Sequence, residues 1–149
     1  IAAALGERGL SLEDISVVHG DFAESFGYEA TATLLGGRKS YTAIMAGDDD
    51  VAAGALAALK AAGRHVPKDI SLVGFDDNFH ARHLTPALTT VRQPVDAVGF
   101  DAAALLNDIL DGRTSGPREI NAATELIVRD SVGRPARLRT RKETGETVR

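Results

Sequence analysis

Three short apolar runs, each closed by glycine or aspartate, constrain the fold of this chain more than any other feature. They cover residues 15–19, 41–46 and 70–75 and have the composition of buried β-strands. Helical spacing of apolar residues follows the first two runs, over residues 21–36 and about 51–62. Strands that alternate with helices in this way predict an α/β domain, with a parallel sheet that carries helices on both faces.

Shorter signals complete the expected order of elements. A helix ends near Gly9, residues 89–92 form a short fourth strand, and residues 125–128 form a final one. Asp21 is expected to cap the helix that follows it, with Glu24 three residues on. Pro94 opens a last long helix that closes at residues 111–112, and its apolar stripe consists of Val95, Val98, Ala102, Leu105, Leu106 and Ile109.

Composition excludes several classes of function. The net charge of −4 disfavours a nucleic-acid surface, and the absence of cysteine removes disulfides, thiolate chemistry and cysteine-based zinc sites. We expect no membrane span and no signal peptide, and cytoplasmic localisation is the inference that fits. Because the chain begins at Ile1 without methionine, we expect it to be part of something longer. Residues 134–149 lack an apolar period and are expected to form a flexible tail.

Polar residues follow the expected strands at the ends where ligands bind in parallel α/β sheets. Asp21 and Phe22 follow the first strand, residues 48–50 are three aspartates after the second, and Asp76 and Asp77 end the third. Carboxylates that accept hydrogen bonds from hydroxyls, beside an aromatic face, suit a neutral polyhydroxyl ligand such as a sugar or a nucleoside.

Structural roles compete with binding at each of these positions. An aspartate before a helix is commonly an N-cap, and we favour capping or loop structure for Asp49 and Asp77. Asp48 and Asp76 come first after their strands and are better placed to face a ligand. Phe22 either stacks on the ligand or packs against the following helix as a hydrophobic staple.

Catalytic and metal-binding interpretations are weaker. Two carboxylates and two imidazoles lie within eight residues, at Asp76, Asp77, His80 and His83, but histidines on a surface turn are more often solvated than ligating. A metal-dependent hydrolase would use Asp48, Asp76 and His80. The chain has no nucleophile elbow and no glycine-rich phosphate loop. We therefore expect no enzyme activity, no cofactor and no metal.

Four phrases resemble the lac repressor family in order and spacing. They are TAIMAGDDDVAAGAL at residues 42–56, VPKDISLVGFDD at 66–77, PALTTVRQP at 86–94 and ELIVRDS at 125–131. The resemblance implies one lobe of a two-lobed, periplasmic-binding-protein-like type I fold, with residues 1–133 as the C-terminal part of the effector-binding domain. It also implies that the helix over residues 95–110 belongs to the other lobe.

The resemblance also implies site residues. Asp76 matches a family aspartate that bonds the effector, Phe22 matches a position where an aromatic ring stacks on it, and Asp50 matches a variable position of the site. Asp48 stands where the family usually has asparagine, which removes a donor, adds negative charge and disfavours an anionic effector. An effector that carries an amino group then becomes conceivable.

The function implied is that of a ligand-responsive transcription regulator. It would bind a sugar-like or nucleoside-like effector and act as a homodimer, and an N-terminal domain absent from this chain would bind operator DNA. A secreted sugar-binding protein that serves a transporter is the alternative, because fold alone does not separate the two classes. The phrase at residues 86–94 favours the regulator.

Overall fold

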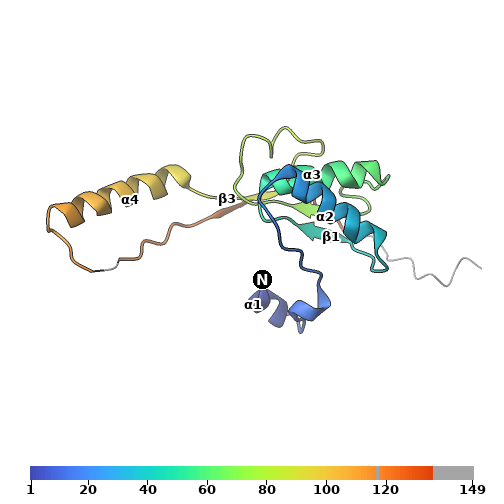
Figure 1. The fold of residues 1–149 in the computed structure, drawn as a ribbon, viewed down its shortest axis with the longest axis horizontal. Coiled ribbons are helices and arrows are strands. Elements are labelled where there is room, and N and C mark those ends of the chain that lie inside the picture. Colours follow the sequence, from blue (N-terminus) through green and yellow to red (C-terminus); the bar gives the residue numbers. More distant parts are fainter. Residues whose placement is uncertain (117, 136–149) are drawn as a thin grey trace, which may run out of the picture.

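A computed structural model describes residues 1–116 and 118–135 and shows a small α/β unit from which one long helix projects (Figure 1). A 3-10 turn at Leu12–Asp14 follows the first helix. The helices are α1 (Ala2–Gly6), α2 (Glu24–Gly36), α3 (Asp49–Ala61) and α4 (Val95–Leu110), and the strands are β1 (Ala43–Met45), β2 (Ser71–Val73), β3 (Thr90–Arg92) and β4 (Glu125–Ile127).

The strands form two two-stranded sheets, β1-β2 and β3-β4. β1 and β2 pair in parallel with Met45 opposite Val73, and a parallel bridge from Val73 to Thr89 brings β3 alongside β2. β4 pairs with β3 in the antiparallel direction. The expected periplasmic-binding-protein-like α/β fold with parallel strands is confirmed.

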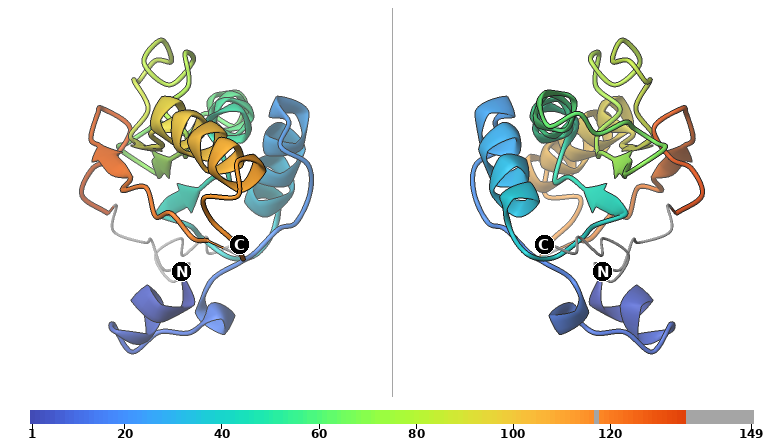
Figure 2. Two further views of the ribbon diagram at one scale, coloured as in Figure 1. Left: turned by 90° about the vertical axis from the view of Figure 1, so that its left-hand side faces the viewer. Right: turned by 90° about the vertical axis from the view of Figure 1, so that its right-hand side faces the viewer.

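Helices α2 and α3 form one layer beside the strands and pack closely on each other (Figure 2). Glycine makes this approach possible, because a Cβ on Gly54 would lie 1.8 Å from the carbonyl oxygen of Glu24, and one on Gly27 would lie 2.1 Å from that of Val51. The core beneath them is built from small aliphatic side chains, among them Ala52, Ala55, Leu56, Leu72 and Leu88. Close helix packing on alanine explains how so few aromatic residues suffice.

The strand expected over residues 15–19 is wrong. The segment is irregular, and Val17 and Val18 are about half exposed. Within the described residues it makes no backbone hydrogen bond to a neighbouring strand, and its one link toward the β1 side is a 3.0 Å hydrogen bond between the hydroxyls of Ser16 and Tyr41. A β-branched sequence becomes a strand only where a partner completes the hydrogen-bond ladder.

The start of α2 also differs from the expectation. Its N-cap is Ala23, which provides no side-chain cap, so Asp21 does not cap this helix. Asp21 lies two residues before the N-cap, whereas a capping side chain stands at the N-cap and accepts from the N–H of the second or third helical residue.

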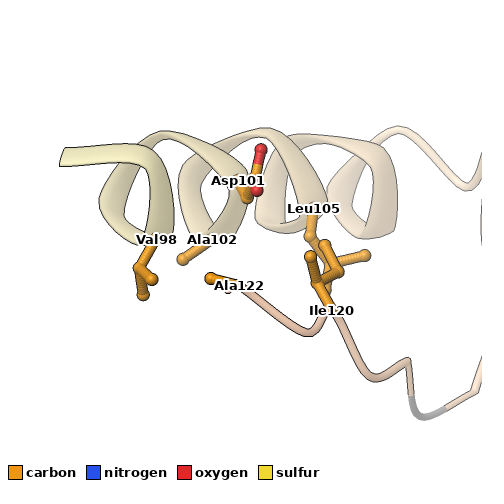
Figure 3. A pocket seen from close by; sticks show the side chains of 6 residues that line it. All are labelled: Val98, Asp101, Ala102, Leu105, Ile120 and Ala122. Carbon is orange, nitrogen blue, oxygen red and sulfur yellow. The ribbon is translucent and has the colours of Figure 1, made fainter. Parts of the chain in front are cut away.

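Helix α4 extends away from the α/β unit as an arm (Figure 1). It follows Pro94, as expected, and Gly112 ends it with a φ of +68°. All of its residues are exposed or half-exposed, including Val98 and Leu106 of the apolar stripe. Within the described residues, the stripe lines a hollow of about 160 Å³ together with Ile120 and Ala122 of the returning chain (Figure 3).

Two further expectations concern membrane-spanning helices and the last residues of the chain. None of the helices within the described residues is long and apolar enough to cross a membrane. The expected tail lies almost entirely outside the described residues, since these end at residue 135.

Candidate functional site

The carboxyl ends of β1 and β2 bring the predicted site residues to one edge of the sheet. Met45 and Val73 are in register, Asp48 lies three residues after Met45, and Asp76 lies three residues after Val73. The two aspartates therefore leave parallel strands at the same level, which is the arrangement that places ligand groups in α/β sheets.

Phe22 lies at this edge beside β1. Its ring is next to Gly47, where a Cβ would be 3.4 Å from Cε1, and the residue is 76% exposed. A ring so exposed does not act as a staple against α2, so that alternative is wrong. The ring forms one wall of a hollow of about 190 Å³ that is lined by Val18, His19, Gly20, Asp21, Phe22, Phe26, Gly47 and Val51.

Asp48, and not Asp49, caps helix α3. Asp48 is the N-cap of α3, because its Oδ1 accepts a 2.7 Å hydrogen bond from the backbone N–H of Val51. Asp49 therefore does not cap α3, but it has the structural role expected for it, because it holds the loop after β2. Capping uses one oxygen of the Asp48 carboxylate, and among the described residues no hydrogen bond involves the other oxygen.

Asp49 is fully buried and links α3 to the strands. It accepts hydrogen bonds from Thr90 Oγ1 at 2.6 Å and from the backbone N–H of Asn78 at 2.8 Å. Burial raises the pKa of Asp49, and the hydrogen bonds from Thr90 and Asn78 oppose that rise. This carboxylate is enclosed by the protein and organises the loop after β2.

Asp50 faces the same loop from the next position. Its Oδ1 accepts a 3.0 Å hydrogen bond from Nδ2 of Asn78, and the residue is half-buried. The structure thus gives Asp50 a contact within the protein, and its predicted part in effector binding stays a prediction.

Asp76 is held in a conformation that few residues adopt. Its φ is 108°, its N–H donates to the carbonyl of Val91 over 2.8 Å, and its Oδ1 accepts a 2.5 Å hydrogen bond from Nε2 of Gln93. Positive φ in a non-glycine residue is strained and tends to occur at functional sites. The residue is half-exposed, so its carboxylate remains open to a ligand.

Asp77 is a structural anchor, as expected from its loop position. Its side chain is 1% exposed and forms ion pairs with Arg92 at 2.7 Å and with Arg129 at 2.5 Å. Burial pushes the pKa of Asp77 up, but the hydrogen bonds from Arg129 and Arg92 outweigh this and hold the pKa below its ordinary value. Both arginines are thereby occupied within the protein.

The metal interpretation finds no support in this geometry. Asp77 is occupied by two arginines, and Phe79 packs against the imidazole of His83 with ring centroids 4.4 Å apart. No group of three or more potential metal ligands comes together within residues 1–116 and 118–135. The same holds for the hydrolase interpretation, which needs Asp48, Asp76 and His80 around one ion.

Sequence reasoning missed the residues that hold the site together. Asn78, Thr90 and Gln93 contact the aspartates directly, and Arg129 reaches Asp77 from 52 positions away. Thr90 and Gln93 lie in the phrase at residues 86–94, and Arg129 lies in the phrase at residues 125–131. Neither phrase indicates which aspartates these residues contact.

Comparisons with known proteins identify the family of the chain. The sequence profile of the family described as periplasmic binding protein-like domain matches residues 1–132. The transcriptional repressor PurR of Yersinia enterocolitica is 38% identical over 129 residues, which are 87% of this chain and 38% of that protein. The chain thus spans well under half the length of this relative.

Two solved structures are similar in fold as well as sequence. The regulator CelR in complex with cellobiose has a TM-score of 0.82 at 36% identity, covering 87% of this chain and 39% of that one. A LacI-family regulator from Enterococcus faecium with bound ribose has a TM-score of 0.78 at 28% identity, covering 87% and 48%. These relatives are regulators, and none of them supports the secreted alternative. The chain therefore belongs to the periplasmic binding protein-like domain family, in the form found in the effector-binding domains of LacI-family transcription regulators.

Proposed function

We propose that this chain is the effector-binding part of a ligand-responsive, DNA-binding transcription regulator, and that its effector is a sugar or a similar polyhydroxyl molecule. The observation that carries the proposal is that Asp48 and Asp76 follow parallel, in-register strands at the same level, with the 76% exposed ring of Phe22 beside Gly47. An open aromatic face and two carboxylates provide the contacts that a carbohydrate needs.

The charges at this edge favour a neutral effector over an anionic one. Asp48 and Asp76 contribute negative charge, whereas Arg92 and Arg129 are engaged by Asp77. A phosphate or carboxylate would meet like charge here, because these two arginines already pair with Asp77. An amino-bearing sugar fits the same charges, and the cellobiose and ribose bound to the similar regulators are both neutral.

The remaining parts of the proposal concern the whole protein. Operator DNA is bound by a domain other than this chain, whose net charge of −4 disfavours DNA contact. The regulator works in the cytoplasm as a homodimer. We expect its groups to serve binding and not catalysis, because the similar proteins are transcription regulators.

The test joins effector binding to DNA binding. Calorimetry measures the affinity of the 149-residue chain for ribose, cellobiose, lactose and guanosine, and fluorescence anisotropy measures binding of a promoter fragment by the longer protein that contains it. We expect one of the first three to bind, and to change DNA affinity by a factor of about 5–150. The chain alone should bind no operator specifically.

Linkage provides the control for this test, because operator DNA must change effector affinity by the same factor. A longer protein that binds no promoter fragment, with or without sugar, would contradict the regulator assignment. Binding of guanosine alone would move the effector from sugars to nucleosides and leave the regulator assignment in place.

A further inference from the structure

The loop that carries Asp76 needs restraint. Asp76 and Asp77 both have positive φ, 108° and 56°. A non-glycine residue near 108° lies outside the regions that L-residues favour, and such a conformation persists only where its surroundings impose it. The groups that restrain this loop therefore decide where the Asp76 carboxylate lies.

One restraint comes from the strands. The N–H of Asp76 is bonded to Val91, and the carboxylate of Asp77 is bonded to Arg92 and Arg129. These contacts hold the loop against β3 and the segment after β4. They do not hold it against α3, which forms the other side of the site.

Asn78 provides that second restraint through its backbone N–H and the NH2 group of its side chain. Its backbone N–H donates to Asp49 Oδ2 at 2.8 Å, and its Nδ2 donates to Asp50 Oδ1 at 3.0 Å. Its Oδ1 accepts from the backbone N–H groups of His80 at 2.9 Å and Ala81 at 3.3 Å. One side chain thus joins the loop to the first turn of α3 and also shapes the turn that follows.

The α3 side of this contact is itself rigid. Asp49 is fully buried and accepts a 2.6 Å hydrogen bond from Thr90 Oγ1. Gly74 leaves it no spare space, because a Cβ there would lie 2.2 Å from Asp49 Oδ1. A loop tied to Asp49 and Asp50 is therefore tied to a fixed point of the fold.

We propose that Asn78 is a positioning residue of the effector site: its side-chain amide joins the loop to α3 and so holds Asp76 at its positive φ. The inference rests on the proposed function only in taking Asp76 as a group that binds effector. The residue type matters, because aspartate at this position could still accept from His80 and Ala81 but could not donate to Asp50. It would also place a carboxylate against Asp50, where like charges repel.

Hydrogen exchange tests the restraint without any effector. The N–H of Asp76 is bonded to Val91 O, and that of Leu72 is bonded to Ser131 O in the core, each at 2.8 Å. We expect N78D to lower the protection of the Asp76 N–H by about 10-fold or more while Leu72 is unchanged, because only the loop opens. The double variant N78D/D50N returns a donor and an acceptor to the two positions with their roles reversed, and it should restore protection.

Two further variants keep this test decisive if N78D does not fold. D50A removes the acceptor and should expose the Asp76 N–H selectively, whereas D50N keeps an acceptor oxygen at the same place and should not. Unchanged protection of Asp76 in N78D and D50A, or a loss that Leu72 shares equally, would overturn the positioning role.

Sugar affinity tests the consequence for binding. Calorimetry on the full 149-residue chain measures its affinity for ribose and cellobiose. N78D should lower the affinity for the sugar that binds by about 10-fold. The same substitution in a D76N background should lower it by less than about 2-fold, because Asn78 acts through Asp76. Equal losses in both backgrounds would contradict the proposal. If neither sugar binds the unaltered chain, the sugar assignment fails, and the hydrogen-exchange comparison still decides the role of Asn78.

Discussion

The side-chain amide of Gln93 donates a 2.5 Å hydrogen bond to the carboxylate of Asp76, and this contact joins the candidate effector site to the base of the α4 arm. Gln93 directly precedes Pro94, the N-cap of α4. Arg92, the residue before Gln93, bonds both Asp77 and Glu125, which lies on the strand that returns from the arm. A hydroxyl bound at Asp76 would share that carboxylate with Gln93.

Replacing the carboxylate of Asp76 should weaken effector binding directly. We expect D76N to reduce affinity for the sugar that binds by about 1–3 kcal/mol, because a charged acceptor for hydroxyl groups is lost. Calorimetry measures the change. D96N, at an exposed position on α4, is the matched control and should leave affinity unaltered. An unchanged affinity in D76N would move the site away from the end of β2.

Removing the ring of Phe22 should affect binding more than stability. The ring is 76% exposed, so F22A should change the free energy of unfolding by less than about 0.5 kcal/mol. Affinity for the sugar should fall by about 1 kcal/mol through loss of stacking. F26A is the counterpart, because Phe26 packs against the core and its loss should lower stability by about 2 kcal/mol or more. Loss of stability without loss of affinity in F22A would point to a packing role.

Two glycine substitutions should have opposite effects on stability. G54A places a methyl group 1.8 Å from the Glu24 carbonyl oxygen and should lower the free energy of unfolding by about 1–3 kcal/mol, since α2 and α3 must separate. Gly99 in α4 has no atom within 4 Å of its Cβ position, so G99A should raise stability by up to about 1 kcal/mol. Urea unfolding measures both. A neutral G54A would mean that the two helices do not approach as closely as described.

Asp77 should make the fold sensitive to acid. Its pKa is lowered in the folded state, so its contribution to stability is present above the ordinary value of 3.8 and is lost as pH falls through the lower folded value. Urea unfolding between pH 7 and pH 2 should show a fall in stability below about pH 4 that is smaller in D77N.

The same variant should be less stable at neutral pH. D77N should lower the free energy of unfolding by about 2–4 kcal/mol at pH 7. This is less than the largest losses seen when a buried ion pair is broken, because Arg92 is 45% exposed. D96N again serves as the exposed control. Parallel pH profiles for D77N and the unaltered chain would show that other groups govern acid unfolding.

The exposed stripe of α4 should cause self-association of the 149-residue chain. Val98 is 48% exposed and Leu106 56% exposed on the same helix, and apolar patches of this kind associate. Size-exclusion chromatography with light scattering should show concentration-dependent oligomers. The double variant V98K/L106K should be monomeric. L12K, at a similarly exposed position outside α4, should not. A monomer whose α4 amides are protected from exchange would show that the helix packs on its own unit.

Much of the fold was predictable because its signals are local. The limits of α3 and α4 follow from apolar spacing, from Pro94 and from the left-handed glycines Gly63 and Gly112, all of which act within a few residues. The edge that carries Phe22, Asp48 and Asp76 was predictable for the related reason that parallel strands end on the same side.

Only the tertiary structure decided which aspartate caps a helix, which is buried and which stays half-exposed at the site. It also decided which apolar run becomes a strand. A carboxylate acquires its role from its partners, and those of Asp49 and Asp77 include Thr90 and Arg129, which lie 41 and 52 positions further along the chain. Residues 15–19 have the composition of a strand but no partner among the described residues to complete a ladder. Side-chain type and spacing are properties of the sequence. A long-range hydrogen bond forms only after folding has brought its donor and its acceptor together.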